Sequence, residues 1–505
     1  MNESHSLNQL IEKPLLFMAA AAVLGVLVGT AVLLSDNFLW PVALVGALLL
    51  LWLVFIHPNA GLALLVFATY TRFSDVLKHE YGMPSFILPL ALLLMAALVM
   101  RWWFLNEEIH NWEGTAVLLG LYGLVSFISL FYAADYFRAQ NALYEFAKDA
   151  LLLFAVVLAL RSRISLRAVV WALIFAGIWM GTLTTYQQLT GTFDNTYWGF
   201  AQTEVKNIVG QVSDHRAGGP LASPNFYAMI LVVLVPLALD RLWHEKQWGL
   251  RFLALWAFLT CLLSIIFTFS RGGFVALVVV LALMLMRKSL KPLHLLLSLA
   301  LLLVAWQFIP TNYTERIYTT LNLLPGSGED ARNEVSFRGR TSEVLVAWQI
   351  FTDHPILGVG RNNYKRYYQE YAQPLGWDNR REERSAHNLY LETAAETGLI
   401  GLAALGAIVG MALWCAYQTQ KTFLRAGQYD EAAIVYALLV ALVGYLVASN
   451  FLHGAFPRYF WLMIGILLAL PQVAAARTAV APAAPRRQTT AAAKEITPAG
   501  RAYAE

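Results

Sequence analysis

The strongest constraint in this sequence is a series of long apolar runs. About fourteen of them, separated by polar, Pro or Gly breaks, are close to the ~20 residues that a helix needs to cross a bilayer. Helices are the expected form because backbone groups in lipid must be hydrogen-bonded within the segment. The runs are 14–34, 38–56, 59–71, 84–104, 115–132, 143–161, 166–189, 221–240, 252–269, 272–287, 292–309, 389–418, 431–450 and 458–475. They predict an all-α polytopic membrane protein with about 12–14 transmembrane helices.

Composition agrees with a membrane protein and argues against other classes. Only 13% of the 505 residues are charged, whereas soluble domains carry about 25%. The net charge of +4 is too small for a nucleic-acid-binding surface, so we expect membrane lipids and no nucleic acid as partners. Cys261 and Cys415 lie inside apolar runs, which favours small buried side chains over a disulfide.

Lys and Arg residues in the short loops predict the orientation. If the N-terminus is cytoplasmic, the inside loops are rich in these residues and the outside loops are poor in them, as the positive-inside rule requires. The outside then includes loops 72–83, 133–142 and 190–220, the turn 270–273 and the turn 451–457. The inside cations are Arg161, Arg163, Arg167, Arg241, Lys246, Arg251, Arg287, Lys288, Lys291, Lys421, Arg425, Arg477, Arg486 and Arg487.

One long polar segment, 310–388, interrupts the apolar runs. It predicts four regions: transmembrane helices with short loops over 1–309, an outside helical cap over 310–388, further transmembrane helices over 389–475, and a disordered tail over 476–505. Helix-like apolar spacing occurs in the cap at 313–324, 341–352 and 362–371.

His387 lies where the cap ends and the membrane segment begins. An imidazole titrates near neutral pH, so this side chain could accept a proton from a hydroxyl nucleophile. A lone histidine at a helix start is more often simply hydrogen-bonded to its neighbours. Glu392 and Glu396 do not orient it from the same helix, because at ~100° per residue they point roughly 140° and 180° away.

Two arginines precede membrane helices on the predicted outer side. Arg271 stands in a Ser-Arg-Gly-Gly turn with apolar runs on both sides, and Arg216 precedes Gly218 and Gly219. Either arginine could bind a diphosphate through its planar fork of donors. Arg271 could equally extend to the lipid headgroups.

Other cations have two interpretations. Arg361, Lys365 and Arg366 form an unopposed basic run in the cap, which could bind substrate or be a solvated helix face. Lys148 lies between Glu145 and Asp149, where it could form a structural ion-pair set or support the cavity. Since the outside loops show no cluster of metal ligands, we expect no metal and no cofactor.

Several segments resemble the O-antigen ligase and polymerase superfamily. The resemblance covers about 210–405, and the earlier helices match only in being apolar. Ligases, polymerases and protein O-oligosaccharyltransferases share these motifs. They are Arg216 to Gly219 followed by Pro224-Asn225, Ser270-Arg271-Gly272-Gly273, 340–348, 354–364 and 385–402.

The resemblance implies a donor, an acceptor and roles for residues. Such proteins have a GT-C-like membrane fold and take an undecaprenyl-diphosphate-linked glycan at the periplasmic face of the bacterial inner membrane. In the ligase, a hydroxyl of the lipid A core oligosaccharide attacks the anomeric carbon with inversion and without a metal. His387 would activate that hydroxyl, while Arg271 and Arg216 would bind the diphosphate. The expected substrate-binding residues are Arg361, Arg340, Lys365, Asn388 and Lys148.

A transporter or flippase for a lipid-linked or anionic solute is the alternative from another class. Ion-coupled transporters usually carry ionisable residues near mid-span. Here the charged residues cluster at one face, which favours the enzyme. Among enzymes, a ligase is the first expectation, followed by a polymerase and a protein O-oligosaccharyltransferase.

Overall fold

The computed structural model describes residues 51–106, 112–209, 212–287, 335–376, 382–454 and 456–475, together with position 46. Several predicted elements lie outside the described residues: the runs 14–34 and 292–309, most of 38–56, the cap helix 313–324, Lys288 and Lys291, and the tail 476–505.

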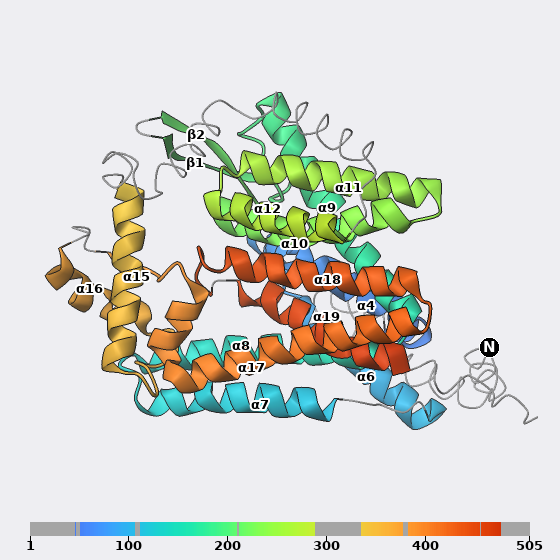
Figure 1. Cartoon of the computed structure of the whole chain (residues 1–505), viewed down its shortest axis with the longest axis horizontal. Coiled ribbons are helices and arrows are strands. Elements are labelled where there is room, and N and C mark those ends of the chain that lie inside the picture. Colours follow the sequence, from blue (N-terminus) through green and yellow to red (C-terminus); the bar gives the residue numbers. More distant parts are fainter. Residues whose placement is uncertain are drawn as a thin grey trace, which may run out of the picture.

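The described residues form a bundle of long helices that run side by side, with a hairpin and two further helices at one end (Figure 1). The bundle helices are α4 (Pro58–Tyr70), α5 (Phe73–Tyr81), α6 (Ile87–Leu105), α7 (Glu113–Ile128), α8 (Tyr136–Ala159), α9 (Arg163–Thr190), α10 (Pro224–His244), α11 (Trp248–Phe267), α12 (Arg271–Met286), α17 (Leu389–Arg425), α18 (Tyr429–Ala448) and α19 (Pro457–Ala475). A short 3-10 helix, η1 (Ser129–Phe131), follows α7.

Eight of the described helices are long and apolar enough to cross a membrane, and the bent pair α4–α5 would make a ninth span. The chain is therefore a mainly helical polytopic membrane protein. The predicted runs within the described residues are all helical. The shortest, 59–71, is followed by a 56° bend into α5. α12 has 16 residues, and α8, with its charged first half, is not among the eight.

Burial separates the inner helices from the outer ones. In its apolar window α10 is 89% buried, whereas α7 and α17 are 33% and 28% buried. A helix that is apolar on all sides belongs in the interior, and α10 meets this condition from Phe226 to Leu239. α7 and α17 present most of their apolar surface outward, as lipid-facing helices do.

The cap contributes α15 (Val335–Asp353) and α16 (Tyr364–Leu375), which lie across one end of the bundle (Figure 1). α15 contains the predicted helix 341–352, and α16 covers all but the first two residues of the predicted helix 362–371. We call the end of the bundle that α15 and α16 cover the cap end. The loop predicted at 190–220 instead contains an antiparallel hairpin of β1 (Gln202–Val209) and β2 (Val212–Gly219), in which Glu204 is opposite Arg216. The sequence analysis predicted an outside loop there and no strands.

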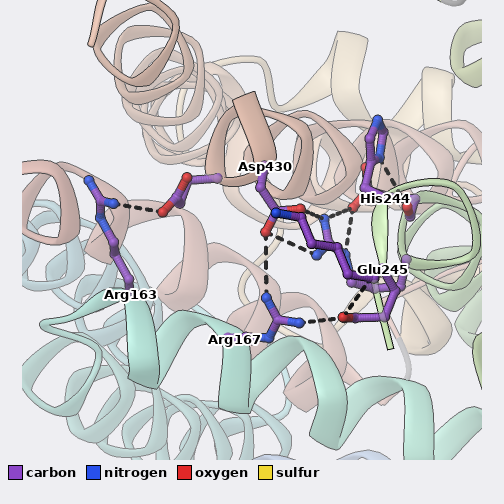
Figure 2. Close-up of polar contacts among 9 residues, drawn as sticks. Arg163, Arg167, His244, Glu245 and Asp430 are labelled. Carbon is purple, nitrogen blue, oxygen red and sulfur yellow. Dashed lines mark hydrogen bonds and ion pairs between the residues drawn. The ribbon is translucent and has the colours of Figure 1, made fainter. Parts of the chain in front are cut away.

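Ion pairs join the helices at the opposite end (Figure 2). Arg241 is fully buried and contacts Asp240 at 2.7 Å and Asp430 at 2.9 Å. Arg167 contacts Glu245 at 2.5 Å and Asp430 at 3.6 Å. Further contacts here are Arg163–Glu431 and His244–Asp240. The cations predicted for the inside loops thus gather at the end away from the cap.

α17 is broken at Gly398, and a loop of the cap fits into the break. Gly398 has φ 62° and ψ −162°, a conformation open essentially to glycine alone. The carbonyls of Ala395 and Glu396 accept hydrogen bonds from the N–H groups of Val359 and Gly360 at 3.0 and 2.8 Å. The cap loop, 354–363, therefore completes the hydrogen bonding of a membrane helix.

The same loop is bonded on its other sides. The N–H of Leu399 donates to the carbonyl of Pro355 at 2.8 Å. The hydroxyl of Tyr132 donates to the carbonyl of Leu357 at 2.6 Å. Asn363 exchanges two hydrogen bonds with the backbone of Asp135. The cap is thus fixed to α17 and to the turn between α7 and α8.

We predict that Gly398→Ala lowers the thermal midpoint and exposes the cap to protease. An added Cβ would lie 2.2 Å from the carbonyl oxygen of Ile356, and a strained backbone costs about 1–3 kcal/mol by itself. Gly410→Ala in the same helix is the control, because its Cβ would meet no atom within 4 Å. Thermal unfolding and limited proteolysis in detergent measure both, and equal midpoints would contradict the prediction.

A second prediction concerns the ion pairs of Figure 2. Arg241→Met leaves buried Asp240 without its guanidinium partner, and loss of one member of a buried pair costs about 3–5 kcal/mol. We expect a clear fall in the thermal midpoint. Exposed Lys246→Met should change it little. A small effect of Arg241→Met would show that the network adds no net stability.

Candidate functional site

His387 lies at the junction of the cap and the bundle, directly before the N-cap of α17. Its backbone has φ 47°, which is uncommon for a residue with a side chain. Nδ1 of the ring lies 2.8 Å from Oε2 of Glu343 and 3.1 Å from the carbonyl oxygen of Ser385. The hydrogen-bond geometry favours the carbonyl, so the carboxylate acts mainly as a close negative charge.

Both neighbours of Nδ1 are acceptors, and this fixes the tautomer of the ring. A neutral imidazole carries one proton, which the hydrogen bond of the other nitrogen assigns. Since Nδ1 faces a carbonyl and a carboxylate, the proton belongs on Nδ1. Nε2 of His387 then keeps its lone pair and can accept a proton from a substrate.

Glu343 was missed by the sequence analysis. It is fully buried on α15, and Arg384 lies 2.5 Å from its Oε1. Val346, Ala347 and Ile350 follow it by three, four and seven positions and are also fully buried. This spacing places a carboxylate on the buried face of the helix, and it was the signal available in the sequence. Glu392 and Glu396, as the angular argument predicted, bind other partners.

The loop between α18 and α19, residues 449–456, forms another side of the junction. The N–H of Leu389 donates to the carbonyl of Ser449 at 3.0 Å, and that of Gly454 donates to Glu392 at 3.0 Å. His453 packs edge-to-face against His387, with ring centroids 5.2 Å apart. The sequence analysis placed this turn outside but assigned it no role.

Arg216 and Arg271 lie close to one another at the cap end. Arg216 is buried on β2, where Nε donates to the carbonyl of Thr268 at 2.9 Å and Nη2 donates to Asn225 at 3.0 Å. Arg271 is the first residue of α12, three positions after Thr268, and Ser270 caps that helix through the N–H of Gly273. The predicted tight turn between two helices is present, but Thr268 to Ser270 make it, with φ 51° at Phe269. Gly272 and Gly273 lie in α12, where they allow close packing against Phe451 and Ala228.

The basic residues of the cap have different surroundings. Arg361 lies 3.9 Å from Glu396 and over the ring of Tyr122 at 5.4 Å, so it is turned toward the buried interior. Lys365 is half-buried near the start of α16, and its charge acts on His453. Arg340 is on α15, one turn before Glu343. Arg366 is exposed, so of the basic run Arg361, Lys365 and Arg366 only this last residue lies on a fully solvated face.

The contacts of Asn388 favour a structural role. Its side-chain oxygen accepts hydrogen bonds from the N–H groups of Tyr390 and Leu391 at 3.0 Å each. Its amide nitrogen donates to the carbonyl of Asn450 at 3.3 Å. Asn388 thus caps α17 and ties the helix to the loop 449–456, which holds His387 in place.

Lys148 forms an ion pair and also lines a cavity. Its Nζ lies 2.5 Å from Glu145, whereas Asp149 faces Arg458 at 3.5 Å. Lys148 also lines a cavity of about 270 Å³ together with Lys78 and Arg458. The other residues described along that cavity are neutral.

Within the described ranges, no three His, Cys, Asp or Glu side chains are grouped to hold a metal ion.

Residues 256–406 match a family model described as O-antigen ligase. This stretch of the chain is therefore similar to the O-antigen ligase family. A search of curated proteins finds no match. The O-antigen ligase domain includes Arg271, Glu343, Arg361 and His387, while Arg216 and His453 lie outside the matched range.

Proposed function

We propose that this protein is an O-antigen ligase that transfers an undecaprenyl-diphosphate-linked glycan to a hydroxyl of lipid A core oligosaccharide. The observation that carries the proposal is the orientation of His387, whose Nε2 is available as a base beside a buried carboxylate. The reaction takes place at the periplasmic face of the bacterial inner membrane. The gathering of cationic loops at the end away from the cap supports this orientation.

The proposed chemistry is a single displacement with inversion. Nε2 of His387 takes the proton of the acceptor hydroxyl as its oxygen bonds to the anomeric carbon. The bond between that carbon and the diphosphate oxygen breaks, and the lipid diphosphate leaves with the electron pair. Glu343 stabilises the imidazolium formed on His387 and holds the ring in place, as the acid partner of a catalytic histidine does elsewhere.

Arg216 and Arg271 are proposed to bind the diphosphate. Hydrogen bonds fix Arg216 beside the turn that begins α12, and the N-terminus of that helix favours an anion. Neutralising the charge that develops on the leaving group is the main contribution required, since diphosphate already leaves readily.

Lys148 and Lys365 are proposed to bind substrate from two sides. The cavity lined by Lys148, Lys78 and Arg458 would suit phosphate groups of the acceptor lipid. The positive charge of Lys365 acts on His453, which packs against His387. For Arg361, Arg340 and Asn388 we propose a supporting role, because Arg361 is paired with Glu396 and Asn388 caps α17.

A polymerase or a protein O-oligosaccharyltransferase would use the same residues on another nucleophile. A transporter is less favoured. The charges near the middle of α8, Lys148 and Asp149, are level with Arg458 at the start of α19 and hence with the cap end. Although they are mid-helix in α8, they lie level with the start of α19, whereas ion-coupled transporters place such groups near mid-span.

A reconstituted transfer assay tests the proposal. Purified protein receives undecaprenyl-diphosphate glycan, with lipid A core and unmodified donor glycan as competing acceptors. Product on lipid A core supports the ligase, and a ladder of lengthened donor glycans would establish a polymerase. His387→Ala should abolish the product while the protein remains folded. Activity that is lost on chelation and restored by a divalent metal would contradict the metal-free scheme.

We predict that Glu343→Gln lowers kcat by about 10²-fold with little change in KM, because general base catalysis contributes about 10²–10⁴-fold. Arg384→Gln is the matched control, since it removes the other partner of the same buried carboxylate. It should lower the thermal midpoint to a similar extent and retain most of the activity. Equal activity losses in the two variants would assign Glu343 to stability alone.

Arg271→Lys is expected to weaken transfer about tenfold or more, because a point charge replaces a planar fork of donors. A charge-assisted hydrogen bond contributes about 1.5–3 kcal/mol, and the loss should raise KM for the donor lipid. Arg251→Lys, on α11 at the end away from the cap, is the control. Full activity of Arg271→Lys would mean that this side chain only reaches toward the headgroups.

A further inference from the structure

We propose that His453 binds the acceptor sugar, with its ring hydrogen-bonded to a hydroxyl next to the one that His387 deprotonates. This inference rests on the proposed glycan transfer. His453 lies outside the matched O-antigen ligase domain and in a loop for which sequence patterns give no helix or strand.

The position of His453 is the first observation. The ring of His453 packs against the ring of His387, with centroids 5.2 Å apart and an interplanar angle of 76°. It also packs against the ring of Phe226 on α10, with centroids 5.1 Å apart and an interplanar angle of 86°. An aromatic wall beside a polar ring is a suitable surface for a sugar, which presents both apolar C–H groups and hydroxyls.

The loop 449–456 touches both halves of the proposed site. Phe451 packs against Gly272, where an added Cβ would lie 2.8 Å from the Cβ of Phe451. Gly272 directly follows Arg271. On its other side the loop is bonded to Leu389 and Glu392 at the start of α17. His453 is thus held next to the base by a loop that also meets the diphosphate-binding turn.

The second observation is a buried nitrogen atom. Nδ1 of His453 is shielded from solvent and has no hydrogen-bond partner among the described residues. Leaving such an atom unpaired costs free energy, and native structures rarely contain one without a functional reason. A substrate group that reaches the ring would remove that cost.

The charge state of the ring selects the ligand. Burial is the main cause that lowers the pKa of His453 to about 3, with smaller contributions from His387, when that ring is protonated, and from Lys365. The ring is therefore neutral at physiological pH and offers one donor and one acceptor. A hydroxyl can pair with either ring nitrogen, because it both donates and accepts, whereas a diphosphate oxygen only accepts. A sugar hydroxyl is thus the better partner.

The test compares His453→Phe with His453→Gln. Phenylalanine keeps the shape of the ring and removes both nitrogens, so we expect KM for the lipid A core acceptor to rise about tenfold or more, with KM for the donor unchanged. Glutamine keeps a donor and an acceptor and should restore part of the affinity. His79→Phe, on exposed α5, controls for a surface aromatic. Unchanged acceptor KM in His453→Phe would overturn the proposal.

Stability separates a binding role from a structural one. His453→Phe removes a buried unpaired nitrogen and should equal or exceed wild type in thermal midpoint. The difference should widen as pH falls below about 6.5, because the unfolded chain then protonates this histidine while the folded chain does not. A lower midpoint with unchanged acceptor KM would assign His453 to structure. A changed pH–rate profile would make it a second base.

A binding measurement keeps this proposal separate from the proposed function. Water-soluble core oligosaccharide, released from lipid A, should raise the thermal midpoint of wild type and of His79→Phe, and not that of His453→Phe. If wild type transfers no glycan yet shows this pattern, the proposed function fails and the sugar site remains. Equal shifts in all three proteins would overturn the sugar site alone.

Discussion

The structure depends on the hydrogen bonds between the cap loop and the break in α17. A membrane helix that stops its own hydrogen bonding leaves carbonyl groups that lipid cannot satisfy. Here Val359 and Gly360 supply the missing donors from the cap, and Gly398 supplies the conformation. The segment of α17 before the break carries Glu392 and Glu396, and His387 immediately precedes it. The position of the candidate base is thus determined by the same bonds that attach the cap.

This arrangement explains why a polar insert and an apolar bundle can share one site. His387 belongs to the start of a bundle helix, while Glu343 is brought from the cap. The arginines arrive from a third direction, through the hairpin and the turn before α12. His387 directly precedes the capped start of α17, and Ser270 caps α12 next to Arg271, so hydrogen bonds fix the backbone at both positions.

The sequence predicted the parts of the fold that are set locally. The apolar runs became helices, a turn at 268–270 separates α11 from α12 close to the predicted position, and two of the cap helices formed where their spacing indicated. The hairpin was missed because residues 202–219 show no regular alternation of apolar and polar side chains. The partner of His387 was missed because Glu343 is 44 positions away in sequence, so only docking of the cap brings the two together. His453 was missed for the same reason, since only the packing of the loop 449–456 gives this ordinary loop residue its neighbours.

The division of the base and its partner between two regions has a consequence for biosynthesis of the protein. Membrane helices can insert as the chain is made, but Glu343 reaches His387 only after the cap has folded and docked onto α17. On the proposed chemistry, a newly inserted chain with an undocked cap holds a histidine without its carboxylate partner and transfers glycan slowly. Docking of the cap onto α17 would then be the step that completes the site.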